Sequence, residues 1–306
     1  MFEQIQFAFS VTGPILVLLL LGIYLRKIDL LDEPFVAVGN RLVFNVTLPL
    51  MLFFSVAEYP VQDVINPGLV GFGVILTLLN VAVLLKLSPW LVQNERKGVF
   101  IQGAFRGNMG IIGLALVLNA YGDQILPIAS VYIGVVTVVY NIVSVWLLGA
   151  PGDAHFLRML RNPLLIGIGA GFAVSLSGLE LPAFVQLSGE YLSGMTLPLA
   201  LLCIGASLSW QSLKSNTRDV AAVTLIKLVV IPLVMVVVAI LLGFRGQDLG
   251  LLFLMMAAPT AAASYVMARQ MTAYGQMAAE IVAVTTALSP LTITLGLVAL
   301  KSLHYL

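Results

Sequence analysis

The sequence consists of long apolar runs that follow one another with only short polar segments between them. A helix needs about 20 apolar residues to cross the hydrocarbon core of a bilayer. Hydrophobic residues make up 60% of the 306 residues and charged residues only 9%, so membrane spans account for nearly the whole chain. We predict an all-α polytopic membrane protein with ten spans. They cover residues 7–25, 36–56, 68–92, 98–119, 124–149, 161–178, 189–208, 217–243, 247–270 and 275–301.

The same composition excludes several classes of function. The 15 basic residues nearly balance the 14 acidic ones, whereas a nucleic-acid-binding protein needs a basic face. One cysteine, Cys203, and two histidines, His155 and His304, are too few for a metal site built on these ligands, and we expect no cofactor. Almost all carboxylates lie in predicted loops, and no nucleophile–base pair or metal triad lies at membrane depth, so we expect no enzyme.

The basic residues predict the orientation in the membrane. Cytoplasmic loops are richer in Lys and Arg than the loops on the opposite side. Two basic residues, Arg245 and Lys301, fall on one side, and eleven fall on the other. We therefore expect a multi-pass protein of the cell (inner) membrane with both termini on the non-cytoplasmic side. Because Glu3 and no basic residue precedes the first run, we expect a span there rather than a cleavable signal peptide. The eleven are Arg26, Lys27, Arg41, Lys86, Arg96, Lys97, Arg158, Arg161, Lys214, Arg218 and Arg269.

An internal repeat divides the chain into residues 1–150 and 151–306. The tetrapeptide Thr47–Leu50 recurs as Thr196–Leu199, an offset of 196 − 47 = 149, and at this offset Pro14 meets Pro163 and Gly22 meets Gly171. Each half then holds five spans. Five is an odd number, so the second half enters the membrane from the opposite face, and this inverted plan is typical of secondary transporters. A duplication that serves membrane packing alone is the alternative reading.

The fourth predicted span contains glycines at every third position, Gly107, Gly110 and Gly113, with Asn108 among them. Glycine weakens a helix and allows the backbone to approach closely. Polar groups at membrane depth are costly, so Asn108 favours a binding site. The alternative is a small-residue face for helix packing. In inverted-repeat transporters such interrupted spans form the substrate site near the midplane.

The ninth predicted span contains a proline at a nearly equivalent place. At the offset of 149, Asn108 maps to Ala257, and Pro259 lies two residues beyond. Proline lacks an N–H group and breaks or kinks a helix. We expect the fourth and ninth spans to be broken helices that cross, with their positive half-helix N-termini favouring an anion. Thr260 and Ser264 would add hydroxyl groups; a simple kink at Pro259 is the alternative.

Prolines also interrupt the second and seventh spans. Pro49 and Pro198 each follow a threonine by two residues, and Asn45 lies one turn before Pro49. A threonine hydroxyl can satisfy a carbonyl that a proline leaves free. These positions either line the substrate cavity from the opposing unit or are kinks in the packing.

Three of the charged residues within the predicted spans are candidates for a role in transport. Lys227 is about 15 Å deep and Glu280 about 7–8 Å deep at 1.5 Å per residue. They are candidates for a proton-titrating couple or for a countercharge to the substrate; a structural ion pair or a snorkelling lysine is the alternative. Arg106, at the inner end of the fourth span, could meet a substrate carboxylate or a lipid phosphate.

Segments of four predicted spans together resemble the auxin efflux carrier family, which includes the plant PIN carriers and bacterial relatives assigned to small dicarboxylates such as malonate. In the fourth span the resemblance lies in Asn108 and in Gly113-Leu114-Ala115-Leu116 followed by Tyr121-Gly122. In the ninth and tenth spans it lies in Ala258-Pro259, in Val266-Met267-Ala268-Arg269 and in Ala287-Leu288-Ser289-Pro290. Leu48-Pro49-Leu50 of the second span also fits, so the similarity covers nearly the whole chain.

The resemblance implies a bile-acid-symporter-like fold with a scaffold of spans 1, 2, 6 and 7 and a transport unit of spans 3–5 and 8–10. It implies elevator-type transport of an organic anion, often by a homodimer joined through the scaffold. Asn108 corresponds to the family's crossover asparagine, and Pro259 to a family proline. Many relatives have proline where this chain has Ala115 and Ser264 (115 + 149 = 264). The break could therefore depend on Gly110 and Pro259 instead.

The function predicted from the sequence is secondary active transport of a small organic anion, auxin-like or dicarboxylate-like, with the proton as a candidate coupling ion. A sodium-coupled carrier of bile-acid type is one alternative, although Glu280 would be its only carboxylate away from the ends of the spans. A membrane sensor that binds a ligand without moving it is another. The chain contains no Walker-type ATP-binding loop, so gradients would drive the transport.

Overall fold

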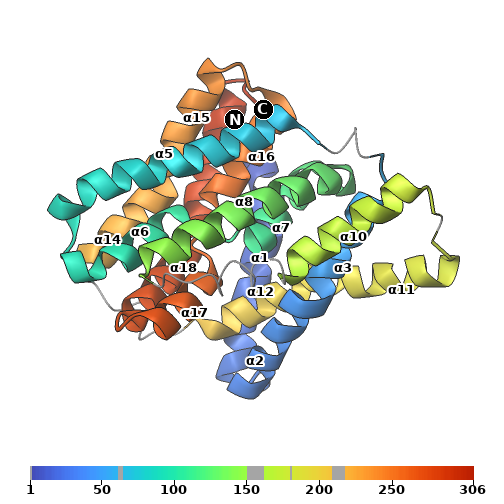
Figure 1. The fold of residues 1–306 in the computed structure, drawn as a ribbon, viewed down its shortest axis with the longest axis horizontal. Helices are drawn as coiled ribbons and strands as arrows, with labels where there is room; N and C mark the ends of the chain where they lie inside the picture. The colour runs from blue at the N-terminus through green and yellow to red at the C-terminus, as the bar shows by residue number, and fades with distance from the viewer. Residues whose placement is uncertain (1, 61–64, 150–161, 180, 209–217) are drawn as a thin grey trace.

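The computed structural model describes residues 2–60, 65–149, 162–179, 181–208 and 218–306. Within these ranges all regular secondary structure is helical, apart from one isolated two-residue bridge. Figure 1 shows helices crossing one another at many angles, with both chain ends at the same end of the molecule. The predicted boundary at residue 150 and three of the basic residues used for orientation, Arg158, Arg161 and Lys214, lie outside the described residues.

Seven helical segments are long and apolar enough to cross a membrane: Phe2–Lys27, Glu33–Ala57, Pro67–Leu91, Asp123–Leu147, Ala183–Ser207, Arg218–Leu241 and Gly275–Ser302. They confirm the prediction of an all-helical polytopic membrane protein. Three shorter apolar helices, Met109–Tyr121, Pro163–Ser177 and Gly246–Ala257, fall where the sequence predicts the fourth, sixth and ninth spans.

The described residues of the first half form eleven helical elements. They are α1 (Phe2–Lys27), α2 (Glu33–Leu42), η1 (Val43–Thr47), α3 (Leu48–Ala57), α5 (Pro67–Leu91), η2 (Asn94–Arg96), α6 (Lys97–Phe105), η3 (Met109–Gly113), α7 (Leu114–Tyr121), η4 (Asp123–Ile125) and α8 (Leu126–Leu147). The elements η1 and η3 are single π-helical turns, and η2 and η4 are single 3₁₀ turns.

The second half forms nine elements in the described residues. They are α10 (Pro163–Ser177), α11 (Ala183–Gly194), α12 (Thr196–Ser207), α14 (Arg218–Leu225), η5 (Ile226–Val230), α15 (Ile231–Leu241), α16 (Gly246–Ala257), α17 (Ala262–Met271) and α18 (Gly275–Ser302). The element η5 is a π-helical turn inside a longer helix.

Polar side chains start three of these helices. The Oδ1 atoms of Asp32, Asn66 and Asn162 accept hydrogen bonds from backbone N–H groups in the first turns of α2, α5 and α10. A proline follows in the first turn of each helix. Side-chain caps of this kind satisfy N–H groups that have no partner within the helix, so the chain marks these starts locally.

Glycines bring two pairs of helices close together. The helix α1 packs along α12, and α10 packs along α3. A side chain at Gly22 of α1 would collide with the backbone of Leu202 in α12, and one at Gly171 of α10 would collide with the backbone of Phe53 in α3. Gly22 and Gly171, which the repeat offset matches, therefore both permit close approach of two backbones.

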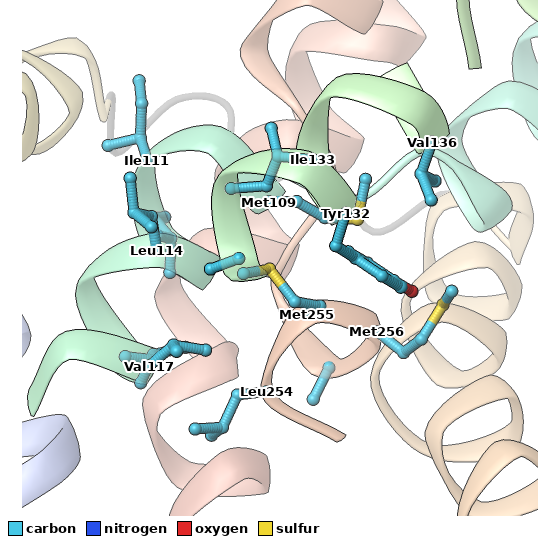
Figure 2. Packing of buried hydrophobic residues seen from close by; sticks show 14 of the residues in the cluster. Met109, Ile111, Leu114, Val117, Tyr132, Ile133, Val136, Leu254, Met255 and Met256 are labelled. Carbon is cyan, nitrogen blue, oxygen red and sulfur yellow. The ribbon is translucent and has the colours of Figure 1, made fainter. Parts of the chain in front are cut away.

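The largest hydrophobic cluster includes α6, α7, α8 and α16. Figure 2 shows side chains such as Met109, Tyr132 and Met255 filling the space between ribbons of this region. Tyr132 and Met255 are completely buried and Met109 is nearly so. The two interrupted helical segments lie within this packed region.

Candidate functional site

The first interruption lies between α6 and η3. The helix α6 ends at Phe105, Arg106 is extended (φ −82°, ψ 94°), and helical structure resumes at Met109. Asn108 is the N-cap residue of the second segment, and its carbonyl oxygen accepts from Gly113 N–H at 3.0 Å. The break expected in the fourth span is therefore present, and no proline occupies it.

The second interruption lies between α16 and α17. The helix α16 ends at Ala257, Ala258 takes an extended conformation (φ −53°, ψ 138°), and α17 begins at Ala262. Pro259 lies within the non-helical segment and is buried. A kink within a continuous helix, the alternative reading of Pro259, does not describe this segment.

The two interruptions pair with each other as a short antiparallel ladder. Gly107 and Thr260 form an isolated antiparallel bridge. Two backbone hydrogen bonds flank it, from Asn108 N–H to Pro259 O at 2.7 Å and from Ala261 N–H to Arg106 O at 2.9 Å. Backbone groups that would be unsatisfied in lipid thus satisfy one another. We call residues 106–108 and 258–261 together the crossover.

These bonds define a local two-fold relationship that differs from the predicted register. If Arg106 is matched with Pro259 and Asn108 with Ala261, each of the two hydrogen bonds becomes the other. This matching corresponds to an offset of 261 − 108 = 153. The starts of η3 and α17 give the same value, 262 − 109 = 153. The mapping of Asn108 onto Ala257 was therefore wrong by four residues. The repeat offset of 149 comes from other parts of the chain, and the ninth span reaches its break four residues later.

The break leaves carbonyl groups at the end of α16 without their helical partners. In a continuous helix Met255 O would accept from residue 259 and Met256 O from residue 260. Pro259 has no N–H, and Thr260 N–H donates instead to Thr285 Oγ1 of α18 at 3.1 Å. Both carbonyls therefore depend on donors from outside the helix.

Lys227 supplies one of these donors. Its Nζ donates to Met256 O at 3.0 Å, and its side chain is completely buried. The lysine lies on the π turn η5 and reaches the crossover from the neighbouring helix. A Cβ added at Gly107 would lie 3.0 Å from this Nζ, so the ammonium group also touches the first interruption.

The predicted pair of Lys227 with Glu280 is absent from the described part of the chain. Glu280 Oε1 accepts from Gln276 Nε2 of its own helix at 3.0 Å. The salt bridge found in the described residues joins Arg96 and Asp219, at 3.1 Å. The two charged residues are therefore separate features, and a proton-titrating Lys–Glu couple has no geometric support.

Arg106 contacts protein rather than substrate or lipid. Its guanidinium donates to Tyr140 O at 3.3 Å, Ser144 Oγ at 2.9 Å and Asn141 Oδ1 at 2.7 Å, all on α8. The side chain is only 6% exposed. Arg106 therefore fastens the first interruption to α8, and its guanidinium group is bonded to acceptors of the protein itself.

The predicted hydroxyl ligands are also buried. Thr260 Oγ1 donates to Gly103 O of α6 at 2.7 Å, so it fills a carbonyl freed by the first interruption. Ser264 Oγ is buried, and among the described residues it has no hydrogen-bond partner. Neither hydroxyl lies on an open surface of the crossover.

Asn108 is, with Ser264, a predicted site residue whose polar side chain has no hydrogen-bond partner among the described residues. No hydrogen bond links its carboxamide to any of the described residues, and it is 7% exposed. It caps the segment Met109–Tyr121 at the start, and the adjacent Gly110 is partly exposed. Across the ladder, Ala262 and Ala263 at the start of α17 are partly exposed as well. The partly exposed positions beside the buried crossover thus belong to the starts of two helical segments, and Asn108 is the polar residue next to them.

The predicted residues of the second and seventh spans lie in different environments. Pro49 is buried, and Leu48 beside it lies 3.7 Å from the position of a Cβ on Gly110. Asn45 is exposed and donates to Arg41 O, and Pro198 is exposed on α12. The structure therefore places the Leu48–Pro49 segment next to the first interruption. Asn45 and Pro198 are exposed and take no part in that buried contact.

Three contributing residues were not predicted. Thr285 accepts Thr260 N–H, the carbonyl of Gly103 accepts the Thr260 hydroxyl, and Gln102 is completely buried with no hydrogen-bond partner for its Oε1 among the described residues. Gln102 and Thr285 are polar residues in apolar spans, and the rule that flagged Asn108 would also have identified them.

Comparison with known proteins finds similarity to membrane transport proteins. The model of a family described as "Membrane transport protein" matches residues 152–297. An "Uncharacterized transporter" of Methanothermobacter thermautotrophicus is 25% identical over 260 residues, which cover 83% of this chain and 85% of that protein. A Rhizobium meliloti protein named "Putative malonate transporter" is 25% identical over 281 residues, which cover 87% of this chain and 88% of the relative.

Proposed function

We propose that the chain is a secondary active transporter of a small organic anion and a member of the membrane transport protein family, with the auxin efflux carriers that its sequence resembles. The substrate is an auxin-like or dicarboxylate-like carboxylate, and the name of the Rhizobium relative points to malonate among the dicarboxylates. The protein works in the inner membrane with both termini outside the cytoplasm, as its basic residues predict.

The free carboxamide of Asn108 at two converging helix N-termini carries the proposal. The first-turn N–H groups of a helix have no acceptor within the helix, and each N-terminus carries about half a positive charge. A carboxylate placed beside Gly110, Ala262 and Ala263 would accept from such amides, and Asn108 would donate to it. Half-helix N-termini bind the carboxylate of the substrate in other transporters with broken helices.

The fold we propose has ten spans in two inverted repeats of five. The exchange of backbone bonds at the crossover and the matched packing of Gly22 and Gly171 support this plan. The scaffold comprises α1 to α3 and α10 to α12, and the transport unit comprises α5 to α8 and α14 to α18. Both interruptions then belong to the transport unit and move together as one body. The protein is a homodimer joined through the scaffold, as the family resemblance implies.

Elevator-type movement would have to exchange the polar contacts between these units. Thr12 and Thr294 hydroxyls lie 2.9 Å apart, Asn119 Nδ2 donates to Val11 O at 2.9 Å, and Ser55 and Ser130 hydroxyls lie 2.7 Å apart. Each contact joins a proposed scaffold helix to a helix of the proposed transport unit. Such neutral bonds contribute about 1 kcal/mol each, which is small enough to be broken and remade during a transport cycle.

Uptake by purified protein in liposomes tests the proposal. Radiolabelled malonate, succinate and indole-3-acetate are offered in turn, and thermal shift measures binding of the same compounds. We expect Asn108→Ala to lower uptake of the substrate about 10-fold to 100-fold, because a hydrogen bond to a charged group contributes about 1.5–3 kcal/mol. Asn94→Ala is the matched control, since Asn94 is exposed in η2, outside the spans.

The outcomes separate the alternatives. Unchanged uptake by folded Asn108→Ala protein would refute the site. Binding without uptake by the unmodified protein would favour a sensor, and uptake that requires sodium would favour the bile-acid type of symporter.

A further inference from the structure

The ammonium group of Lys227 is completely buried, and no carboxylate of the described residues lies within salt-bridge distance of it. Within the described part of the chain Lys227 forms no salt bridge, and Glu280 is occupied by Gln276. An isolated charge in a low-dielectric interior is strongly unfavourable unless other groups compensate it. The position of Lys227 therefore requires a source of negative potential at the crossover.

The C-terminal end of α16 provides that potential. A helix C-terminus carries about half a negative charge on its free carbonyl groups, and here Pro259 and the redirected Thr260 N–H leave Met255 O and Met256 O without helical donors. Lys227 Nζ donates to Met256 O at 3.0 Å. A Cβ added at Gly107 would lie 3.0 Å from Lys227 Nζ and 3.4 Å from both Ala258 O and Met255 O. The ammonium group thus lies beside a small cluster of backbone carbonyls.

Unwound carbonyls and half-helix C-termini are the groups with which broken-helix transporters hold a coupling cation. From this correspondence, and on the premise of the proposed function, we infer that Lys227 is a built-in cation that occupies the place of a dissociable sodium or potassium ion. Its charge neutralises the end of α16 and holds the second interruption in the shape that pairs with the first. Anion transport by this protein then requires no added monovalent cation.

The π turn η5 fits this role. A π-helical turn inserts an extra residue into a helix and is frequent at functional sites. The turn spans Ile226–Val230, is followed by Pro232, and contains Lys227 as its second residue. It sets the direction in which the lysine leaves its helix. Lys227 acts through the backbone of Met256 and is therefore a positioning residue for the anion site.

Chemical rescue tests the inference. Unmodified protein in liposomes should take up its substrate equally well when sodium and potassium are replaced by choline. Lys227→Ala leaves a vacant place beside the carbonyls, and we expect its uptake in choline to fall about 10-fold to 100-fold, the range for a lost hydrogen bond to a charged group. Sodium or ethylammonium should restore much of it. Lys227→Met fills the same space without charge and should stay inactive in every salt.

A readout independent of transport completes the test. Ethylammonium or sodium should raise the melting temperature of Lys227→Ala, and should not raise that of the unmodified protein or of Lys227→Met. The inference fails if Lys227→Met transports normally, if no cation changes either uptake or melting of Lys227→Ala, or if unmodified protein requires sodium or potassium. The last arm needs no variant, so it decides the question even if Lys227→Ala does not fold. Absence of any anion uptake by unmodified protein would instead contradict the proposed function, while the melting arm would still test the cation site.

Discussion

The two halves of the crossover share a backbone arrangement and differ in nearly every side chain. Helical structure resumes at Met109 in one and at Ala262 in the other, and the same pair of backbone bonds joins them. The N-cap residue is Asn108 in the first half and Ala261 in the second. The backbone thus provides two positive helix ends, whereas one side chain alone gives the site a polar, hydrogen-bonding group.

The causes of the two breaks differ as well. In the first half the backbone leaves the helix at Arg106 without a proline, and the side chain of this arginine holds the segment against α8. In the second half Pro259 removes an N–H group, and the cation comes from another helix as Lys227. Arg106 and Pro259 are equivalent positions under the local two-fold relationship. A symmetric backbone can therefore be stabilised by unrelated local chemistry, and substitutions should affect the two halves unequally.

The largest effect is expected at Arg106. Arg106→Met removes a buried cation from Tyr140 O, Ser144 Oγ and Asn141 Oδ1 and leaves these acceptors without it. Each unsatisfied buried group costs about 1–3 kcal/mol, so we expect strong destabilisation and loss of folded protein, measured by melting in detergent and by size-exclusion chromatography. Arg269→Met, which removes an exposed arginine bonded to Tyr265, is the control. Equal melting temperatures for the two variants would contradict the fastening role.

A smaller effect is expected at Gly107. Gly107→Ala places a Cβ 3.0 Å from Lys227 Nζ and 3.4 Å from two backbone carbonyls, so the lysine or the ladder must shift. Overpacking of this kind costs about 1–3 kcal/mol, and we expect lower uptake together with a lower melting temperature. Gly71→Ala, in α5 and away from the proposed anion site, is the control, because an added Cβ there would meet no atom of the described residues within 4 Å. If both variants behave alike, the close approach at Gly107 is not a constraint.

The sequence identified where the helices break but could not identify how the breaks pair. Glycines around Asn108 and the lone Pro259 are local signals, and both interruptions were found from them. The register was wrong by four residues because the offset of 149 reflects positions such as Gly22 and Gly171, far from the breaks. Side-chain direction was also inaccessible: the depth of Lys227 follows from helical rise, but the π turn and the freed carbonyl of Met256 decide where its ammonium group lies.

The same limit explains the interpretation of Thr260 and Arg106. Each is polar and lies at the expected level, so each was a reasonable candidate ligand. The structure uses both to satisfy backbone or side-chain groups of neighbouring helices, Gly103 in one case and α8 in the other. A polar residue at membrane depth serves either a ligand or the protein's own unsatisfied groups, and the sequence does not separate these two uses.

The smallest effect, and the one that most sharpens the comparison, is expected at Ala261. This residue has the extended conformation of an N-cap (φ −66°, ψ 135°) but no side chain that can accept from α17. Ala261→Ser supplies such an acceptor, and a serine N-cap stabilises a helix by about 0.5–2 kcal/mol relative to alanine. We therefore expect a slightly higher melting temperature in detergent. Uptake should change little, since Asn108 would still be the residue that donates to the substrate. A lower melting temperature would mean that the space beside Ala261 admits no further atom, and that the likeness of the two halves ends at the backbone.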